Sequence, residues 1–292
     1  MINISSTLAA LTPVGFIDVY FRTLKNSMLN QGSHTMLNKT LSRMPDSSRQ
    51  FIQGDPLKMI DWKAYARNDQ LIVREVREDA QAKVGILVSL AHSMEWPAVG
   101  QDFTDGIPKA ELAIRVGLAL AYAHAKKGDL VDIYVVDTTN SLSIYKPKSS
   151  SDVEGIYIQL CESGFGSFTD FCHQCDSMAA RMDLCWIIED GLNEDWVRKI
   201  QNLSAKICYL HTFSQYEMDI SWLDDKTTYF DADWNRNEYQ GSTLKYERNY
   251  DNNFKYWRKK RQEDVESHGG QYVLLTDLTP ISYFAEFVRT VI

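Results

Sequence analysis

The sequence lacks any apolar run of the length, about eighteen residues, that a membrane-spanning helix needs. Its first stretch, from Met1 to Phe21, is mildly apolar, but it has no basic residue before Arg22 and Pro13 interrupts it. A secretory signal peptide is therefore not expected. We expect a soluble, cytoplasmic chain without a transmembrane segment.

An excess of positive charge is missing as well. The 292 residues carry 31 lysines and arginines against 39 aspartates and glutamates, which gives a formal net charge of -8. Because nucleic-acid binding relies on basic surface, this balance argues against a nucleic-acid partner. The basic run from Arg258 to Arg261 is followed at once by Glu263 and Asp264, which favours a solvated helix face over a nucleic-acid site.

Cysteines are few and odd in number. The five are Cys161, Cys172, Cys175, Cys185 and Cys208. This set suits reduced thiols in a reducing compartment better than a disulfide framework. Cys172 and Cys175 have the spacing of half a zinc site, but a structural site needs four ligands and the chain has no second pair. We therefore favour buried or partly exposed thiols over zinc.

From residue 84 onward, apolar runs alternate with helical patterns. The predicted strands are 84–90, 131–136, 182–188, 205–210 and 272–275, and the predicted helices include 108–127, 196–203 and 280–291. Strands separated by helices of this length indicate an α/β fold with a doubly wound, mostly parallel sheet and helices on both faces. Pro108 suits the first turn of its helix, and Gly128 suits the end.

The regions on either side of this pattern differ from it. We expect residues 1–80 to form an N-terminal lead-in, with a loop at 45–48 and a small β-containing segment at 71–76, and residues 81–292 to form the α/β domain. An aromatic-rich C-terminal extension interrupts that domain. Its segments 228–231 and 240–244 predict a small hairpin or an addition to the edge of the sheet, and a helix from Tyr246 to Glu266 is expected to follow.

Polar side chains gather where the predicted strands end. These ends are Ser89 to Ser93, Asp137 with Thr138, and Glu189 with Asp190. Ligands of open α/β sheets bind at the carboxyl ends of strands, so this edge is the candidate site. Signs of catalysis are weak, because His92 and Ser93 are adjacent in a turn and point apart, and the chain has no phosphate-binding glycine loop. We expect no enzymatic activity.

A long spaced motif precedes the first core strand. Gly54-Asp55 is followed after four residues by Ile60-Asp61-Trp62-Lys63, then by Ala66-Arg67, an apolar strand and Arg74-Glu75. Further on come Ser93-Met94, Lys109-x-Glu111 and Gly128-Asp129. Together these elements resemble the signature of the domain of unknown function 58 family. The resemblance runs from about Ser48 to Asp190, and the chain is similar to the shorter form without two N-terminal membrane helices.

The resemblance implies a von Willebrand factor A-like α/β domain preceded by a β-containing segment. It also implies an association with MoxR-type AAA+ ATPases, and with other von Willebrand A proteins, in assembling or maturing a protein complex. We therefore expect a non-enzymatic protein-interaction module without a cofactor. The alternative is a divalent-metal-binding domain or a metal-dependent hydrolase that uses the strand-end site.

The metal site of von Willebrand A domains offers a test of that alternative. Its first element reads Asp-x-Ser-x-Ser, where this chain has Ser89, Ala91 and Ser93. The ligands that remain are Ser93, Thr169 and Asp190, a poor cage for magnesium. The resemblance thus implies a degenerate site that stays empty of metal. We expect Asp190 to be held by backbone amides of the Ser93 turn or by a nearby lysine or arginine.

The role of the motif itself has two interpretations. Its polar and aromatic members are Gly54, Asp55, Asp61, Trp62, Lys63 and Arg67. They form either an ion-pair network that pins the lead-in onto the sheet, with Trp62 as a buried anchor, or an exposed dock for the ATPase. The sequence favours the junction, because spaced motifs of this kind more often hold a structural contact.

Overall fold

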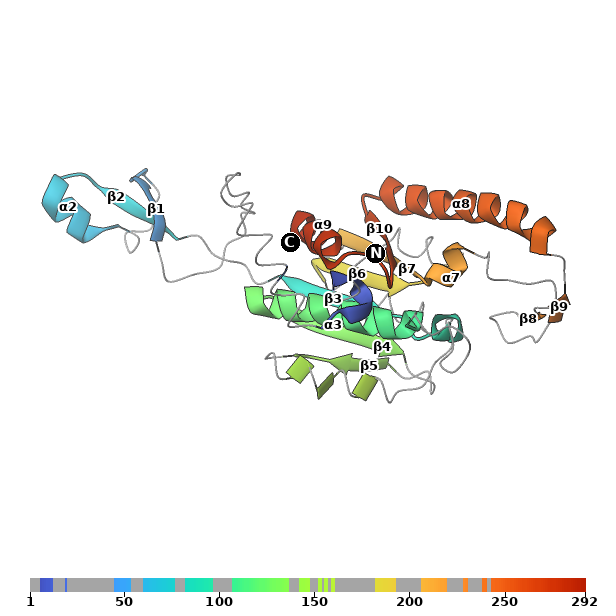
Figure 1. Cartoon of the computed structure of the whole chain (residues 1–292). Coiled ribbons are helices and arrows are strands. Elements are labelled where there is room, and N and C mark those ends of the chain that lie inside the picture. Colours follow the sequence, from blue (N-terminus) through green and yellow to red (C-terminus); the bar gives the residue numbers. More distant parts are fainter. Residues whose placement is uncertain are drawn as a thin grey trace. The chain divides into compact units, whose positions relative to one another are not determined.

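The computed structural model describes residues 6–12, 19, 45–53, 60–76, 82–96, 107–136, 142–147, 152–153, 155–156, 159–160, 182–192, 206–219, 228–230, 238–240 and 243–292. The chain divides into two compact units (Figure 1). One unit comprises Asn30–Gln81, and the other comprises Met1–Leu29 together with Ala82–Ile292. By this division the described N-terminal residues 6–12 fall in the large unit.

The small unit pairs two antiparallel strands, β1 (Pro45–Gln50) and β2 (Ile72–Val76), and carries the short helix α2 (Trp62–Asn68). Strand β2 is the predicted one. The loop expected at 45–48 is instead part of β1, because pairing with β2 satisfies the backbone of this polar segment. Helix α2 ends at Asp69, whose φ of 51° places it in the left-handed region.

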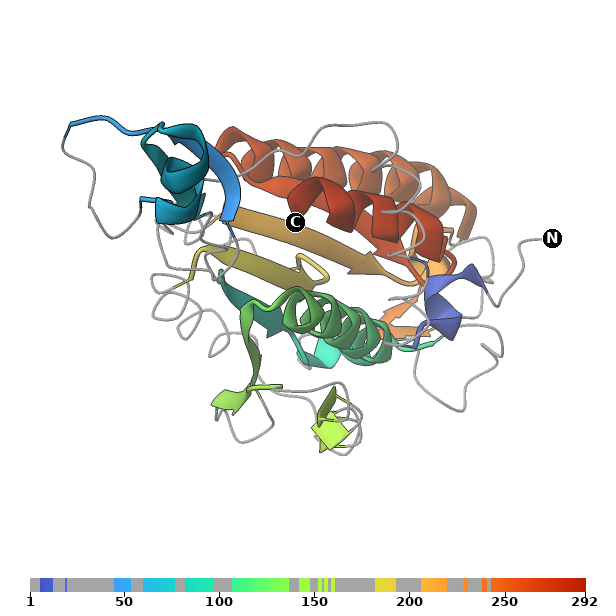
Figure 2. The same cartoon turned by 90° about the vertical axis from the view of Figure 1, so that its left-hand side faces the viewer.

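The large unit contains a six-stranded sheet in the order β10-β7-β6-β3-β4-β5. All neighbouring pairs are parallel except β4 with β5. The bounds are β3 (Lys83–Val88), β4 (Leu130–Val136), β5 (Leu142–Tyr145), β6 (Leu184–Glu189), β7 (Lys206–Phe213) and β10 (Gln271–Thr276). The predicted doubly wound, mostly parallel α/β sheet is confirmed, with β5 as an additional antiparallel edge (Figure 2).

Helices and short turns complete this unit. They are η2 (Leu8–Ala10), η4 (His92–Glu95), α3 (Lys109–Lys127), α7 (Gln215–Met218), α8 (Thr243–Ser267) and α9 (Ile281–Val291), with a separate pair of strands, β8 (Thr228–Phe230) and β9 (Glu238–Gln240). The predicted glycine stop is confirmed, since Gly128 caps α3 with a φ of 98°. The extension forms a hairpin pair rather than an edge of the main sheet, with its second strand earlier than predicted because α8 already begins at Thr243. The helix predicted at 196–203 lies outside the described residues.

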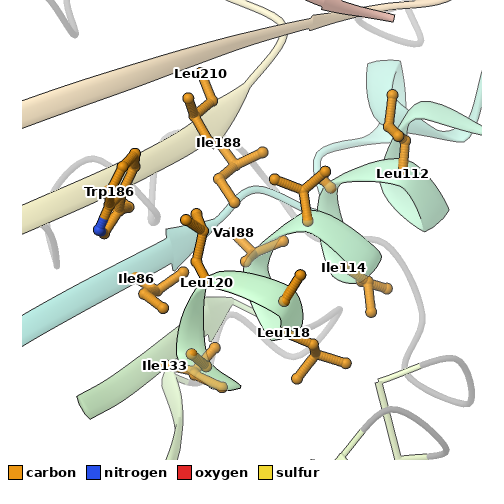
Figure 3. Close-up of a cluster of buried hydrophobic side chains, with 14 of the residues drawn as sticks. Ile86, Val88, Leu112, Ile114, Leu118, Leu120, Ile133, Trp186, Ile188 and Leu210 are labelled. Carbon is orange, nitrogen blue, oxygen red and sulfur yellow. The ribbon is translucent and has the colours of Figure 1, made fainter. Parts of the chain in front are cut away.

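One face of the sheet is apolar and is covered by α3 and α9. Figure 3 shows side chains of α3 pointing at the strands, where they meet Val88, Trp186 and Ile188. Gly117 allows the close approach of α3, because a Cβ there would lie 2.9 Å from Cγ2 of Val88. Val273 and Leu275 of β10 are buried in the same cluster as Phe284 and Val288 of α9.

The N-terminal segment closes one end of this core. Leu8 and Leu11 are buried in it, and the backbone N–H of Leu8 donates to the carbonyl of Thr279 (2.8 Å). The guanidinium of Arg115 donates to the carbonyl of Ala9. These contacts explain why the first residues belong with the large unit, even though residues 30–81 separate them from it in sequence.

The opposite face of β6, β7 and β10 carries several polar and aromatic side chains. Since side chains alternate along a strand, Glu189, Tyr209, His211 and Tyr272 lie on the side away from the apolar cluster. Helix α8 covers them: Trp257 of this helix contacts His211 with a ring-centroid distance of 5.1 Å. The two faces of one sheet therefore have different chemistry, and the candidate site lies where both meet.

Candidate functional site

The predicted strand-end residues Ser89 and Asp190 come from neighbouring strands. Ser89 follows β3, and its backbone N–H donates to the carbonyl of Ile188 on β6 (3.0 Å), while Asp190 directly follows β6. Both residues are buried. Ser89 Oγ accepts a long hydrogen bond from the N–H of Ala91 (3.4 Å), so this hydroxyl serves the local turn. Ser93 lies in η4, and Thr169 is outside the described residues.

Lys109 supplies the positive charge at this edge. It is the first residue of α3, only 1% exposed, and its Nζ donates to Asp190 Oδ2 at 3.0 Å and to Glu217 Oε1 at 2.6 Å. The expectation that a lysine or arginine holds Asp190 is therefore met by Lys109. Burial by itself lowers the pKa of the Lys109 ammonium, but the two carboxylates outweigh it and raise that pKa, so the side chain stays charged.

Each partner of Lys109 is fixed by its own element. Asp190 Oδ1 lies 3.5 Å from the N–H of Leu192. Glu217 belongs to α7, where its carboxylate also accepts from the N–H of Ser214 (3.0 Å) in a capping box. The ammonium thus ties together the end of β6, the first turn of α3 and the turn after β7. A lysine ammonium stands between the carboxylates that a divalent cation would need, and this arrangement closes the strand-end site.

No group of three or more His, Cys, Asp or Glu side chains suited to a metal ion occurs in the part of the chain that the structure describes. Cys172 and Cys175 are outside that part, whereas Cys185 and Cys208 are buried free thiols.

A second buried network lies beside the first, under α8. Glu189, the last residue of β6, is fully buried, and its Oε1 accepts from the hydroxyl of Tyr209 at 2.5 Å. Its Oε2 has no hydrogen-bond partner among the described residues. Burial raises the pKa of Glu189 to about 8, the hydrogen bond from Tyr209 opposes this, and the neighbouring Asp190 adds to it.

His211 connects this network to the strand-end cluster. Its Nε2 lies 2.8 Å from the carbonyl of Asp190, which can only accept, so Nε2 carries the proton. Its Nδ1 then accepts from the hydroxyl of Tyr272 at 2.6 Å. Burial lowers the pKa of His211 to about 3, so the ring is neutral. Gly191 is required beside it, because its φ is 69° and a Cβ there would lie 2.4 Å from His211 Nε2.

Helix α8 is anchored to both networks. Arg261 Nη2 donates to the carbonyl of Gly191 (2.9 Å), and its guanidinium lies 5.9 Å from the ring centre of Trp257. The hydroxyl of Tyr250 donates to the carbonyl of Glu217 at 2.7 Å. Arg261, which belongs to the basic run of the sequence, is therefore a buried anchor. Its neighbours Lys259 and Lys260 are exposed, as expected for a solvated helix face.

The motif residues lie in the small unit. Asp61 caps α2, since its Oδ1 accepts from the N–H groups of Lys63 (3.0 Å) and Ala64 (3.1 Å). Arg67 Nε donates to the carbonyl of Lys63 at 3.1 Å. Trp62 is 58% exposed and contacts the ring of Tyr65. Gly54 and Asp55 lie outside the described residues.

Sequence reasoning did not assign roles to the residues that organise the site. Lys109 entered only as part of the family resemblance, although it carries a usable signal: a lysine in the first turn of a helix faces the positive end of the helix dipole and needs an acidic partner. Tyr209, His211 and Arg261 carry no such signal, because their pairing depends on the register of β6 with β7 and on where α8 packs.

The comparisons with known proteins agree with the motif. The model of the family "Protein of unknown function DUF58" matches residues 47–218, which is more than half of the chain. The chain belongs to this family. No functionally curated protein matches this DUF58 chain.

Among solved structures, the conserved hypothetical protein BatB from Bacteroides thetaiotaomicron is 12% identical, with a TM-score of 0.41, and the match covers 72% of this chain and 98% of that one. An uncharacterised membrane spanning protein from Vibrio fischeri is 13% identical, with a TM-score of 0.23, over 71% of this chain and 95% of that one. In the DUF58 chain itself, the described helices include none with the length and apolar character needed to cross a membrane.

Proposed function

We propose that this DUF58 chain is a non-enzymatic protein-interaction module that acts with a MoxR-type AAA+ ATPase, in the cytoplasm, in the assembly or maturation of a protein complex. Other von Willebrand A proteins are candidate members of that complex. The proposal starts from the family resemblance carried by the Gly54 to Arg67 motif. The observation that supports it most is the exposure of the aromatic residues on that motif.

Helix α2 presents these residues to solvent. None of its seven residues, all of them described, is buried, and Trp62 and Tyr65 keep 58% and 38% of their surface exposed. Large aromatic side chains are uncommon on free surfaces and frequent at the centres of protein interfaces. Lys63 and Arg67 add two positive charges to the same helix. This combination favours the docking interpretation of the motif over the junction interpretation.

The closed strand-end site supports an interaction role in a second way. In the rival interpretation, a metal-binding domain or metal-dependent hydrolase, the edge of the sheet has to offer open oxygen ligands to a cation. Here Asp190 and Glu217 are both bonded to the ammonium of Lys109, which is tethered to α3 and cannot leave. The site is therefore better suited to hold the fold together than to bind a free ion.

The test is a pull-down of a MoxR-type ATPase by the full chain under nucleotide-trapping conditions. We expect the unmodified chain to recover the ATPase and Trp62→Ala to reduce recovery by about tenfold or more, as truncation of an aromatic hot spot does. Tyr256→Ala is the matched control, since Tyr256 is an exposed aromatic on α8 and its loss should leave recovery unchanged.

Failure of the unmodified chain to recover any AAA+ protein would overturn the ATPase partnership. Equal losses in the two variants would show that α2 is not the docking surface.

A further inference from the structure

The small unit buries few large apolar side chains and exposes several. Among the side chains described there, the buried apolar ones are Ile60 and Val73. Four large ones are exposed, and together they are called the apolar patch: Ile52, Trp62, Tyr65 and Leu71. A two-stranded ribbon is only marginally stable in water until another surface packs on it. The unit therefore carries the kind of surface that a partner covers.

Backbone hydrogen bonds gather the apolar patch around the start of β2. The N–H of Phe51 donates to the carbonyl of Leu71 at 2.9 Å, so the chain that leaves β1 lies beside this residue. The N–H of Asp61 donates to the carbonyl of Ile72 at 2.8 Å, and α2 begins at the residue after Asp61. Three segments of the unit thus bring their exposed apolar side chains to one place.

Two positive charges on α2 border the apolar patch. Lys63 and Arg67 are exposed and four residues apart, so they lie on the same side of the helix. Arg67 Nε donates to the carbonyl of Lys63 at 3.1 Å, which holds the guanidinium against the helix. Neither side chain forms an ion pair with a described residue. The acids stand at the two ends, where Asp61 caps the first turn and Asp69 follows the last, so the middle of α2 is positively charged.

We propose that the apolar patch, with Lys63 and Arg67, fits an acidic face of the ATPase on which carboxylates border an apolar surface. The inference rests on the proposed function and names the chemistry of the partner surface. Aromatic residues at the centre of an interface, where water is excluded, supply much of the binding energy. Charges at the rim steer the partners together and fix their orientation. Trp62 and Tyr65 thus anchor the contact, and the two cations select the partner.

The distribution of charge along the chain supports an acidic partner at this place. Asn30–Gln81 contains eight lysines and arginines and seven aspartates and glutamates, whereas the rest of the chain contains 23 and 32. The excess of carboxylates in the large unit repels an acidic surface, and the small unit has no such excess. Because salt screens exposed charges beyond about 8–10 Å, the cations next to the patch decide which surface is held there.

Titration of the full chain with the MoxR-type ATPase, under nucleotide-trapping conditions and at about 50 and about 300 mM salt, tests the charge match. We expect the unmodified chain to bind more weakly at the higher salt. Lys63→Gln combined with Arg67→Gln should weaken binding about five- to tenfold at the lower salt, and most of the salt dependence should disappear. Arg67→Lys keeps the charge and should bind like the unmodified chain.

Two further variants make this result specific. Lys255→Gln combined with Lys260→Gln removes two exposed lysines from α8, which is the same change in net charge at another place. Its affinity should stay within about twofold of that of the unmodified chain. Lys63→Gln alone leaves the bond from Arg67 to the helix backbone in place, so it tests the charge even if the double variant disrupts α2. It should weaken binding about two- to threefold.

Several outcomes would overturn the acidic match. If Trp62→Ala weakens binding but the loss of Lys63 and Arg67 does not, the patch docks on an uncharged surface and the proposed function stands. Equal losses in the two double variants would assign the effect to net charge. Concentration-dependent dimerisation of the chain alone, abolished by Trp62→Ala, would assign the patch to a second copy. If the ATPase does not bind the unmodified chain at all, the partnership and the acidic match fall together.

Discussion

The two faces of the large sheet are built from the same strands, yet they hold their buried polar groups in different ways. On the apolar face, His124 of α3 accepts from the indole N–H of Trp186 (2.9 Å), so its Nδ1 carries the proton and donates to Asp129 (2.7 Å). On the face under α8, His211 has the opposite tautomer, with the proton on Nε2. Each ring is neutral and fully bonded.

The two faces differ in how the carboxyl groups beside these histidines are hydrogen-bonded. The carboxylate of Asp129 accepts from the His124 ring and also lies 3.3 Å from the N–H of Ala82. Under α8, Glu189 has a buried oxygen without a described partner. On the apolar face, the buried polar groups that join α3 to the sheet are hydrogen-bonded to one another. On the face under α8, the burial of Glu189 opposes the ionisation of its carboxyl group.

The largest expected effect is on the face under α8. The pKa of Glu189 is raised from 4.5 to about 8 by burial, so its favourable contribution is complete below about pH 4.5 and is lost as pH rises through about 8. Glu189→Gln removes this dependence. As pH rises from about 5 to about 9, we expect the unmodified chain to lose up to about 4–5 kcal/mol of its free energy of unfolding, a loss that the variant does not show. Urea unfolding at both pH values measures it, and parallel pH profiles would contradict it.

Next in size is the loss of the ammonium at the edge where both faces meet. Lys109→Met leaves the buried carboxylate of Asp190 and the half-buried one of Glu217 without a cation, which should lower the free energy of unfolding by about 3–5 kcal/mol. Lys146→Met is the control, because Lys146 is an exposed partner of Asp132 and its loss should cost less than about 1 kcal/mol. If urea unfolding shows the same loss of free energy of unfolding in both variants, the ion pairs of Lys109 contribute no more than a surface ion pair does.

The apolar face should respond to acid in the opposite direction. Burial lowers the pKa of His124 below its usual 6.5, with the bond to Asp129 acting against this. A group held neutral in the fold takes up its proton on unfolding, so its contribution is present above about pH 6.5 and is lost as pH falls below that value. We expect fluorescence of the buried Trp186 to report loss of its bond to His124 in acid. The free energy of unfolding is measured in the Glu189→Gln variant, which lacks the pH dependence of Glu189. If it rises as pH falls below 6.5, the expectation for His124 is contradicted.

The smallest expected effect on stability lies in the other unit. Because Trp62 is 58% exposed, Trp62→Ala should change the free energy of unfolding by no more than about 0.5 kcal/mol. A buried aromatic anchor, as in the junction interpretation, would instead lose about 3–5 kcal/mol. Thermal unfolding of this variant separates the docking interpretation from the junction interpretation. A loss of about 3–5 kcal/mol would favour the junction.

The central sheet could be predicted because its strands are continuous apolar runs between helices, as in Val84 to Val88. Strand β1 could not, since Pro45–Gln50 is polar and becomes a strand only through pairing with β2. The place of the N-terminal residues depends on the burial of Leu8 and Leu11, a tertiary effect without a local pattern.

In the candidate site, the strand-end rule pointed to Asp190 from the sequence alone. Its partner Lys109 is the first residue of α3, 81 residues away in sequence, and the second carboxylate on that ammonium comes from α7, so spacing could not identify either. The exposure of Trp62 could not be predicted from the sequence either. Whether an aromatic residue of a seven-residue helix is buried depends on what packs against that helix, and the motif does not specify it.

The closure of the strand-end site by Lys109 is the central claim, and titration calorimetry with magnesium and manganese tests it most directly. The unmodified chain should bind neither ion, because the ammonium already occupies the position between Asp190 and Glu217 and bonds to both. The pair Ser89→Asp and Ala91→Ser restores the missing ligands of the metal-site pattern, and it should bind an ion only weakly until Lys109→Ala is added. Clear binding by the unmodified chain that Asp190→Asn abolishes would contradict the account and favour the metal-binding alternative.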